Sequence, residues 1–578
     1  MPKVIIVGAG KLSPGLWWFG LVAAKTYLQV NPTHTLLLLE SSTTIGGTWS
    51  QDRVYDGLVT HNAAGALEVS DTPLEGAPTA EGYIRGEDVA NYLVKFAEKY
   101  NLLSRIVFEA LVDSIDRDVD TKEWILKLAR KSEGEDEVRC EKLIMATGLT
   151  SMPFIPTDIH IMDPKMTIFH SVELKKWQET LKSDKQGVER VTIYGGGKSA
   201  FDAAYMCAAA GKKVDWIIRE SGQSVSSMFS AKALGKTSPL LASKRLFNAL
   251  SPCIYNSETM TSKFLHGTSV GRWMVKTYWK TLNNIVMKKH GMYTSENGRK
   301  LVPELGEMGG FWSGAAPSGV ISQPDFLTHL HAPDSLITIH RTRITSIEGT
   351  TIRLANGTSL PSDAHIWCTG WIRDTTPLAR GSLELALRVG VPVPEESSPE
   401  HWEALESTAE DKIKSLFPLL SMPPPYNPIR RSNTPYRVYR LLAPPAMADV
   451  GDYTLVFVGL THTPATGMIA ELQALWATAY LDGRIPLEGK KGEMEKEVAE
   501  VNVWMKRRYL NLGEKCANLT FEFMPYLDTL VGDLGLNRRR KGGVSEWFGT
   551  YSPRDYRGIV SEWTRKSEKV DRKSLKGN

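Results

Sequence analysis

The sequence has little of what a membrane-spanning or disulfide-exchanging protein needs. Only five of its 578 residues are cysteine, and no two of them form a C-x-x-C pair or share metal-ligand spacing. No window of eighteen residues is apolar throughout, whereas a spanning helix needs about 20 such residues. These absences exclude a dithiol reductase and predict a protein with no membrane span and no metal site.

The sequence also has almost no excess of charge of either sign. Its 69 Lys and Arg face 65 Asp and Glu, which leaves a formal net charge of +4. A nucleic-acid partner is therefore not expected, and the basic run at 538–541 is interpreted as a solvated face. With 42% apolar and 23% charged residues, the chain has the composition of a globular protein long enough for two or three domains.

Targeting signals are missing at both ends of the sequence. The first apolar strand is expected to begin at Lys3, which leaves no room for a signal peptide before it. The final residues, Ser574-Leu575-Lys576-Gly577-Asn578, match neither an endoplasmic-reticulum nor a peroxisomal signal. We therefore expect a cytoplasmic protein, with a frayed tail from Thr564 onward.

The first fifty residues contain the pattern of a dinucleotide-binding unit. A strand at 4–7 leads into Gly8-Ala9-Gly10, a helix is expected at 20–29, and a second strand at 35–39 ends in Glu40. Glycines let the backbone approach a pyrophosphate, a helix N-terminus offers free N–H groups, and a carboxylate accepts from ribose hydroxyls. Gly8, Gly10 and Glu40 are therefore predicted to bind a dinucleotide.

The spacing of this first glycine loop departs from the usual motif. Nine residues separate Gly10 from Gly20, where two are expected. With Gly20 as the third glycine, Glu40 follows at the expected interval of twenty residues, whereas Gly15 would give twenty-five. We therefore assign Gly20 to the motif and regard residues 11–17 as surplus, either a natural insertion or a gene-model error. In either case the strength of cofactor binding is an open question.

A second, uninterrupted unit follows later in the chain. A strand at 191–194 leads into the loop Gly195-Gly196-Gly197-Lys198-Ser199-Ala200, a helix, and a strand at 214–218 that ends in Arg219. Gly195, Gly197, Ser199 and Ala200 are predicted to surround a pyrophosphate. An arginine in place of a carboxylate suits a ribose 2′-phosphate, which favours NADPH over NADH. Two units of different specificity imply electron transfer, and FAD with NADPH is the natural pair.

Several short motifs, in their order along the chain, resemble those of the flavin-containing monooxygenases. They are Gly46-Gly47-Thr48-Trp49, Thr60-His61-Asn62, Ala146-Thr147-Gly148, Cys368-Thr369-Gly370-Trp371 and the segment from Glu471 to Trp476. The resemblance implies that Gly47, Thr48 and Trp49 lie beside the flavin, that Val112 contacts adenine, and that Gly148 closes the FAD domain. It makes Asn62 the leading catalytic candidate. Gly459, between a strand and a helix, is expected to aim its N–H at the flavin.

The same resemblance implies an α/β fold with two Rossmann-like dinucleotide-binding domains, the NADPH domain being inserted into the FAD domain. We expect the first part of the FAD domain at 1–160 and the NADPH domain at 161–345, with a helical insertion at about 223–319. The second part of the FAD domain is expected at 346–485 and a C-terminal extension, like that of fungal members, at 486–578.

The resemblance further implies an NADPH-dependent FAD monooxygenase for a small organic substrate of secondary-metabolite biosynthesis. In that chemistry NADPH reduces FAD, O2 adds at the flavin C4a position, and the hydroperoxide delivers one oxygen atom while the other leaves as water. The linker around Phe169-His170 matches the family signature only in part, so Baeyer–Villiger oxidation of a ketone stays open. A flavoprotein reductase and a binding protein with a degenerate site are further alternatives.

Overall fold

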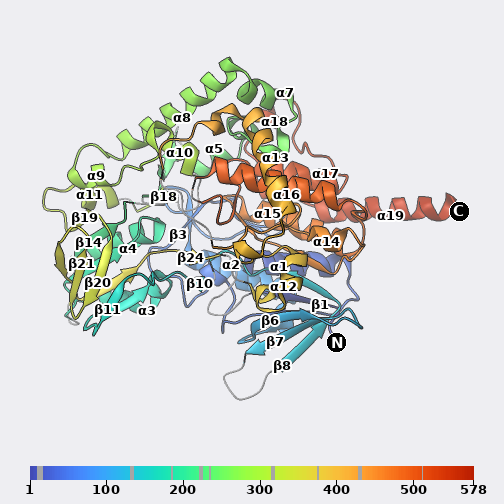
Figure 1. The fold of residues 1–578 in the computed structure, drawn as a ribbon, viewed down its shortest axis with the longest axis horizontal. Helices are drawn as coiled ribbons and strands as arrows, with labels where there is room; N and C mark the ends of the chain where they lie inside the picture. Colours follow the sequence, from blue (N-terminus) through green and yellow to red (C-terminus); the bar gives the residue numbers. More distant parts are fainter. Residues whose placement is uncertain are drawn as a thin grey trace.

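The structure, a computed structural model, is an α/β fold built on two five-stranded parallel sheets (Figure 1). It describes residues 1–8, 17–129, 136–150, 152–183, 187–220, 225–233, 236–313, 319–323, 325–373, 376–426, 432–510 and 512–577. Gly10 and nearly all of the surplus loop 11–17 therefore lie outside the described residues.

The first sheet has the strand order β25-β9-β1-β2-β5. Its strands are β1 (Val4–Val7), β2 (Leu36–Leu39), β5 (Ile106–Val107), β9 (Lys142–Met145) and β25 (Leu455–Phe457), and all pairs are parallel. The sequences of β1 and β2 are VIIV and LLLL, without polar alternation, as expected for strands covered on both faces. The sheet thus combines strands from the start of the chain with one from far along it.

Helix α1 (Trp17–Val30) connects β1 to β2 and begins three residues before the expected start. Gly20 lies in its first turn, where a Cβ would be 3.5 Å from the Ala146 Cβ and 3.8 Å from the Ile6 side chain. This is the close contact of helix with strand that the third glycine of the motif permits. The packing is compatible with the assignment of Gly20.

The second sheet has the order β12-β23-β13-β14-β19. Its strands are β12 (Thr167–His170), β13 (Arg190–Tyr194), β14 (Lys213–Ile218), β19 (Ile337–Arg341) and β23 (Ala364–Trp367). Helix α4 (Lys198–Ala209) follows β13. The predicted domain boundary at 345 is wrong, because β23 pairs with both β12 and β13 inside this sheet.

Two smaller sheets flank the main ones. The first is a meander of β6 (Leu111–Arg117), β7 (Trp124–Ala129) and β8 (Asp136–Cys140), and the second contains β11 (His160–Met162), β20 (Ile344–Glu348), β21 (Thr351–Leu354) and β22 (Ser359–Pro361). The segment 106–117 contains two strands, because β5 pairs with β2 while β6 turns away to pair with β7.

The chain between β14 and β19 contains several helices at one end of the molecule (Figure 1). In agreement with the helical insertion expected at about 223–319, this part of the chain includes α6 (Arg245–Ala249) and the longer α8 (Ser269–Lys289). We call the segment 225–323 the helical insertion.

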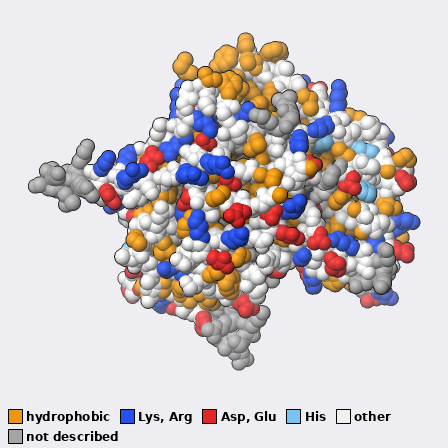
Figure 2. All heavy atoms as spheres, turned by 180° about the vertical axis from the view of Figure 1, so that it is seen from behind, with side chains coloured by type: hydrophobic (Ala, Val, Ile, Leu, Met, Phe, Trp, Pro, Cys, Tyr) orange, Lys and Arg blue, Asp and Glu red, His pale blue; other side chains and the backbone are white. Residues whose placement is uncertain are grey.

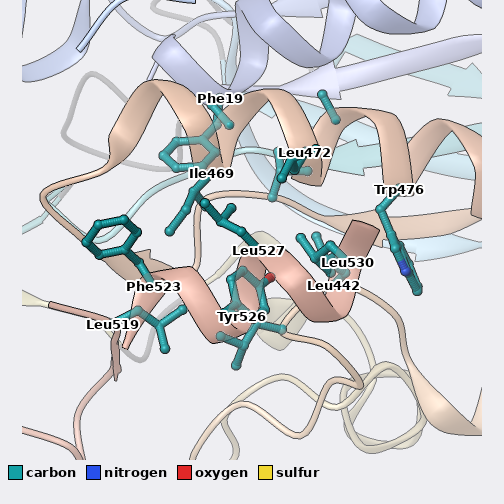
Figure 3. Close-up of a cluster of buried hydrophobic side chains, with 14 of the residues drawn as sticks. Phe19, Leu442, Ile469, Leu472, Trp476, Leu519, Phe523, Tyr526, Leu527 and Leu530 are labelled. Atoms are coloured by element: carbon teal, nitrogen blue, oxygen red, sulfur yellow. The ribbon is translucent and has the colours of Figure 1, made fainter. Parts of the chain in front are cut away.

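The C-terminal part of the chain packs on the first sheet through α15 (Thr466–Leu481), every residue of which from Gly467 onward is buried. Figure 3 shows α17 (Phe523–Asp533) lying against α15, with Phe523, Leu527 and Leu530 directed toward Ile469 and Leu472. The expected frayed tail is instead helical, as α19 (Ile559–Gly577). No helix in the described part of the chain is both long enough and apolar enough to span a bilayer.

The remaining elements connect these parts. The helices are α2 (Gly86–Lys99), α3 (Leu174–Lys182), α5 (Ser238–Ala242), α7 (Met260–Ser262), α9 (Glu296–Lys300), α10 (Gly309–Ser313), α11 (Phe326–His331), α12 (Leu383–Val389), α13 (His401–Leu416), α14 (Pro445–Ala448), α16 (Lys491–Arg508) and α18 (Ser545–Phe548). The short strands are β3 (Val59–Ala63), β4 (Tyr83–Arg85), β10 (Met152–Pro153), β15 (Met228–Ser230), β16 (Lys232–Ala233), β17 (Lys236–Thr237), β18 (Gly319–Ile321), β24 (Trp371–Ile372), β26 (Thr461–His462) and β27 (Ala517–Asn518).

Candidate active site

A cavity of about 300 Å³ lies where residues of the two dinucleotide units meet. Its walls come from both units, from the linker after β12 and from the loop before α15. They are Thr48, Trp49, Arg53, Tyr55, Leu58, Val59, His61, Asn62, Ser171, Val172, Lys198, Ser199, Asp202, Trp371, His462, Thr463 and Pro464. Three residues that the sequence assigns to the first unit (Thr48, Trp49 and Asn62) and one from the second (Ser199) thus line one space.

Asn62 lies in this cavity on β3 and is 7% exposed. Its side-chain amide donates a hydrogen bond to the backbone carbonyl of Pro464. A buried amide held in this way has a fixed orientation, since losing a buried partner costs about 1 to 3 kcal/mol. The structure therefore presents Asn62 as an oriented polar group in the cavity wall.

Asp202, on α4, connects the two units across the cavity. It accepts a hydrogen bond from the Tyr55 hydroxyl at 2.7 Å and forms an ion pair with Lys198 one helical turn away. Its other oxygen accepts from Gln323. Because the charge of Lys198 is neutralised by Asp202, this pair adds no net charge to the cavity.

Arg53 is a buried cation in the same wall. It is 9% exposed, and its guanidinium lies 5.4 Å from the centre of the Trp371 ring. Its Nη1 is buried and has no hydrogen-bond partner among the described residues. Burial lowers the pKa of this guanidinium to about 10. A cation that remains charged at neutral pH, with a donor left over, is suited to an anionic or strongly polar oxygen.

Two histidines line the cavity as neutral groups. Burial lowers the pKa of His61 and of His462 to about 3, so neither carries a charge near neutral pH. His462 has a buried Nε2 without a partner among the described residues. Nearby, His170 accepts from the Val172 N–H at 3.2 Å and its other nitrogen is 3.1 Å from the Gly370 carbonyl. These two partners assign a neutral His170 with a structural role.

Glu40 provides a test of whether the first unit fits FAD. It follows β2, is fully buried, and one of its oxygens, Oε1, accepts from the Ser42 N–H at 2.8 Å. The other oxygen, Oε2, has no partner within the described residues. A buried carboxylate oxygen without a donor is costly unless a ligand supplies one. The free oxygen of Glu40 fits the ribose hydroxyls of an adenosine group.

The structure also describes the local conformation or contacts of further residues assigned to FAD. Gly47, Thr48 and Trp49 form one turn of 3-10 helix, and the Thr48 hydroxyl lies 3.1 Å from that of Thr150. Gly8 follows β1, and its N–H donates to Leu39. Gly148 has a φ of 67°.

Two further FAD assignments, Val112 and Gly459, take part in internal packing. The Val112 side chain is fully buried, and its backbone pairs with Leu128, so an adenine contact stays a prediction. Gly459 differs from expectation, because its N–H already donates to Gln473 Oε1 at 2.9 Å. A Cβ at Gly459 would lie 2.9 Å from the Phe19 ring, so this glycine is explained by packing.

The second unit fits a pyrophosphate at its glycine loop. Gly195 has a φ of 143°, and a Cβ there would lie 2.1 Å from the Cys368 carbonyl oxygen, so only glycine is possible. Gly197 is the N-cap of α4, with no side chain capping the first N–H groups. Ser199 lines the cavity and Ala200 is fully buried. The start of α4 is thus open to an anion, as in dinucleotide-binding loops.

Arg219 is exposed at the end of β14. Burial raises the pKa of the nearby Tyr194 phenol, and the positive charges of Arg219 and Arg343 act in the opposite direction. Two exposed arginines therefore lie within electrostatic range of one tyrosine. Arg343 comes from the segment after β19, and the sequence contained no local motif that would have identified it.

Sequence reasoning also missed several residues of the cavity wall. Arg53, Tyr55, Asp202 and His462 were not assigned to the site, although Arg53 follows the Gly47-Thr48-Trp49 turn by only four residues. His462 occurs in a short segment between a strand and a helix, which is a weak signal. Tyr55 and Asp202 are brought together only by the packing of one unit on the other.

Comparisons with known proteins agree with this architecture. A family profile described as pyridine nucleotide-disulphide oxidoreductase matches residues 5–242. The five cysteines of this chain are free and buried in the structure.

Solved structures with a similar fold include a polycyclic ketone monooxygenase from Thermothelomyces thermophila. It has a TM-score of 0.58 and 14% identity, with 92% of this chain and 87% of that chain covered. A steroid monooxygenase bound to NADP has a TM-score of 0.57 and 16% identity, with 92% and 98% covered. These likenesses show a fold with two Rossmann-like dinucleotide-binding domains.

Fungal proteins are similar over nearly the whole sequence. The FAD-dependent monooxygenase resA of Aspergillus sclerotiorum is 35% identical over 590 aligned positions, covering 99% of this chain and 99% of the relative. The FAD-dependent monooxygenase DEP4 of Alternaria brassicicola is 34% identical, covering 97% and 94%. With the two sheets, the shared cavity and the Glu40 site, this similarity shows that the chain belongs to the FAD-dependent monooxygenases.

Proposed function

We propose that this protein uses NADPH and FAD to insert one oxygen atom from O2 into a small organic substrate of secondary metabolism. The observation that carries the proposal is the single cavity lined by Thr48, Trp49 and Asn62 from one unit and by Lys198 and Ser199 from the other. Two redox cofactors exchange electrons only where their sites meet, and this cavity is such a place.

The residues present fit both cofactors. The free oxygen of Glu40 suits the FAD ribose, and the turn at Gly47 leads to the cavity. The open helix start at Gly197 and the exposed Arg219 suit the pyrophosphate and 2′-phosphate of NADPH. When bound, NADPH supplies hydride and the flavin supplies activation of O2 at its C4a position.

The chain's own contribution is positioning and the exclusion of water. Asn62 presents an amide of fixed orientation, and the neutral side chains of His61 and His462 add polar groups without charge. Trp49 and Trp371 provide apolar wall. A cavity of this kind holds donors in place before the reaction and keeps bulk water away from a reactive oxygen species.

Baeyer–Villiger oxidation of a ketone is the second candidate, and Arg53 is the observation that favours it. A buried guanidinium with an unpartnered Nη1 within the described residues stabilises negative charge that develops on a carbonyl oxygen. Oxidation of an amine, a sulfide or an alkene would not need that stabilisation.

The proposal is tested with purified protein in three steps. First, the visible absorption spectrum should show bound flavin that is bleached by NADPH under anaerobic conditions. Next, ketones, amines, sulfides and alkenes are screened for O2-dependent oxidation of NADPH. Finally, mass spectrometry should find one atom from isotopically labelled O2 in the product. Bleaching without label in any product would indicate a reductase, and protein that cannot be reconstituted with FAD would indicate a degenerate site.

A further inference from the structure

The helical insertion carries a group of exposed apolar side chains that is separate from the cavity. Met260 is 89% exposed, Phe264 47%, Val270 62%, Trp273 66% and Met274 41%. Figure 2 shows hydrophobic side chains gathered at the top edge of the molecule, where Figure 1 places α7 and the beginning of α8. Large exposed apolar groups that gather in one place mark an interaction surface. We call these five residues the apolar tip.

The exposed apolar residues of α8 are additional to the apolar residues that this helix buries against the protein. On α8, Val275, Trp279 and Val286 are buried and pack into the protein. Val270, Trp273 and Met274 lie on the opposite side and contribute little to that packing. Exposure of a tryptophan in such a position is costly in water and is explained by a partner.

The segment that carries the tip is basic. Residues 258–290 contain six Lys or Arg and a single acidic residue, Glu258, which pairs with Lys263 at 2.9 Å. Lys280 pairs with Glu307 from outside this segment. Lys288 and Lys289 are exposed near the end of α8. An aromatic and aliphatic tip on a basic segment matches the interface of an anionic lipid bilayer, where apolar side chains enter the headgroup layer and Lys or Arg meet lipid phosphates.

A shallow groove lies beside the tip and supports this assignment. It has a volume of about 260 Å³, and its lining includes Lys276, the ion pair of Lys280 with Glu307, and the apolar side chains of Leu305, Met308 and Trp312. The ammonium group of Lys276 next to this apolar wall suits a phospholipid, whose headgroup is anionic and whose chain is apolar.

A second copy of the chain is a poorer occupant. In a two-fold symmetric dimer the same surface faces itself, so the lysines of α8 would be brought against those of the other copy. Like charges placed together oppose association. A lipid surface instead supplies the opposite charge.

We propose that the apolar tip and the lysines of α8 dock this protein on the surface of an anionic membrane, with no segment crossing the bilayer. The proposal concerns the surface alone and does not depend on the reaction catalysed in the cavity.

Vesicle flotation of the full-length protein tests this proposal. Wild-type protein should float with vesicles of phosphatidylcholine and phosphatidylserine, and less with phosphatidylcholine alone or at high salt. The double variant Val270→Ser, Trp273→Ser should lower the partition coefficient by at least about tenfold. The double variant Val119→Ser, Val450→Ser is the matched control, because these valines are 79% and 66% exposed elsewhere. It should float like wild type.

Flavin absorbance and thermal unfolding of each variant show that the fold is retained, which is expected because every changed side chain is exposed. Failure of wild type to float with anionic vesicles overturns the proposal. Equal flotation of the tip variant and wild type also overturns it. Sedimentation velocity detects the remaining outcome, in which the tip variant dissolves a dimer while lipid has no effect, and this result would assign the tip to a second copy.

Discussion

The side-chain amide of Asn62 and the backbone carbonyl of Pro464 form a hydrogen bond between residues 402 positions apart in the sequence. It connects β3, after the Gly47-Thr48-Trp49 turn, to the loop that precedes α15. Both residues line the cavity. The wall of the site is therefore held by a contact between the two ends of the first dinucleotide unit.

Substitution Asn62→Ala should leave FAD bound but lower the product formed per NADPH consumed, with the difference appearing as hydrogen peroxide. Loss of one oriented donor commonly costs about 2.7 to 4 kcal/mol in the affected step, a hundredfold or more. Asn502→Ala is the control, since Asn502 also donates to a backbone carbonyl, that of Tyr436 at 3.0 Å, away from the cavity. Peroxide and product assays at steady state make the comparison. Full coupling in the Asn62 variant would reduce this residue to a structural role.

Substitution Arg219→Ala should weaken the use of NADPH far more than that of NADH. A hydrogen bond to a charged group is worth about 1.5 to 3 kcal/mol, so the preference should fall by about ten- to a hundredfold. Arg343→Ala should act in the same direction, because the positive charges of both arginines act to lower the pKa of the same phenol, that of Tyr194. Arg353→Ala, which removes an exposed arginine of β21, serves as control. The ratio of kcat/KM for the two nucleotides is measured, and an unchanged ratio would remove Arg219 from the site.

The affinity for FAD should depend on pH through Glu40. Burial raises the pKa of this carboxyl from its ordinary value of 4.5 to about 7. Ribose hydroxyls donate to the ionised form, so at a pH below about 7 the apoprotein must lose a proton to bind. Affinity should then fall about tenfold for each unit of decreasing pH and be constant above about pH 7. Flavin fluorescence titrations measure this, and Glu40→Gln should bind more weakly with no such slope. A flat wild-type profile would contradict the assignment.

Breaking the ion pair of Arg508 with Glu522 inside the C-terminal extension should strongly destabilise the protein, including the contact of Arg508 with the helical insertion. Both side chains are fully buried, with Nε and Oε1 3.0 Å apart, and Arg508 also donates to the Phe311 carbonyl in the insertion. Glu522→Gln leaves a buried charge without its partner and should lower the free energy of unfolding by about 3 to 5 kcal/mol. Glu75→Gln breaks the exposed pair with Lys95, which should cost at most about 1 kcal/mol. Denaturant unfolding compares them, and equal midpoints would refute the prediction.

Deletion of residues 11–17 should raise FAD occupancy or leave it unchanged. The shortened loop restores the expected three-glycine spacing, and α1 loses only Trp17, its first residue. The contact of Gly20 with Ala146 stays in place. Flavin content per protein is measured from the absorption spectrum. Loss of FAD from the shortened protein would show that Gly20 is the wrong third glycine and return Gly15 to consideration.

Much of the fold could be predicted from the sequence because the information is local. The apolar strands before Gly8 and Gly195, the helices after them and the charged residues Glu40 and Arg219 follow one another within about fifty residues in each unit. The boundary at 345 could not be placed in this way. Whether the strand at 364–367 returns to the first sheet or joins the second depends on its pairing with β12 and β13, which no local pattern records.

Only part of the candidate site could be predicted from the sequence, because the other residues reach it through tertiary contacts. Thr48, Trp49 and Asn62 occur in recognisable motifs, whereas Arg53 and Asp202 acquire their roles from tertiary contacts with Trp371 and Tyr55. The N–H of Gly459 was expected to point at the flavin, but it donates to the side chain of Gln473, which lies in α15. Glycine spacing predicts where a backbone can approach a ligand and does not show which group has already paired with it.

The late position of β25 in the sequence has a consequence for synthesis on the ribosome. This strand pairs with β9, more than three hundred residues earlier, whereas among the described residues the second sheet has no strand beyond Trp367. The described strands of the second sheet are thus all present in the growing chain while one edge of β9 still lacks its neighbour. Completion of the first sheet waits until residue 455 of 578 has been synthesised, and a nascent chain that stops before Leu455 leaves one edge of the apolar strand β9 open to aggregation.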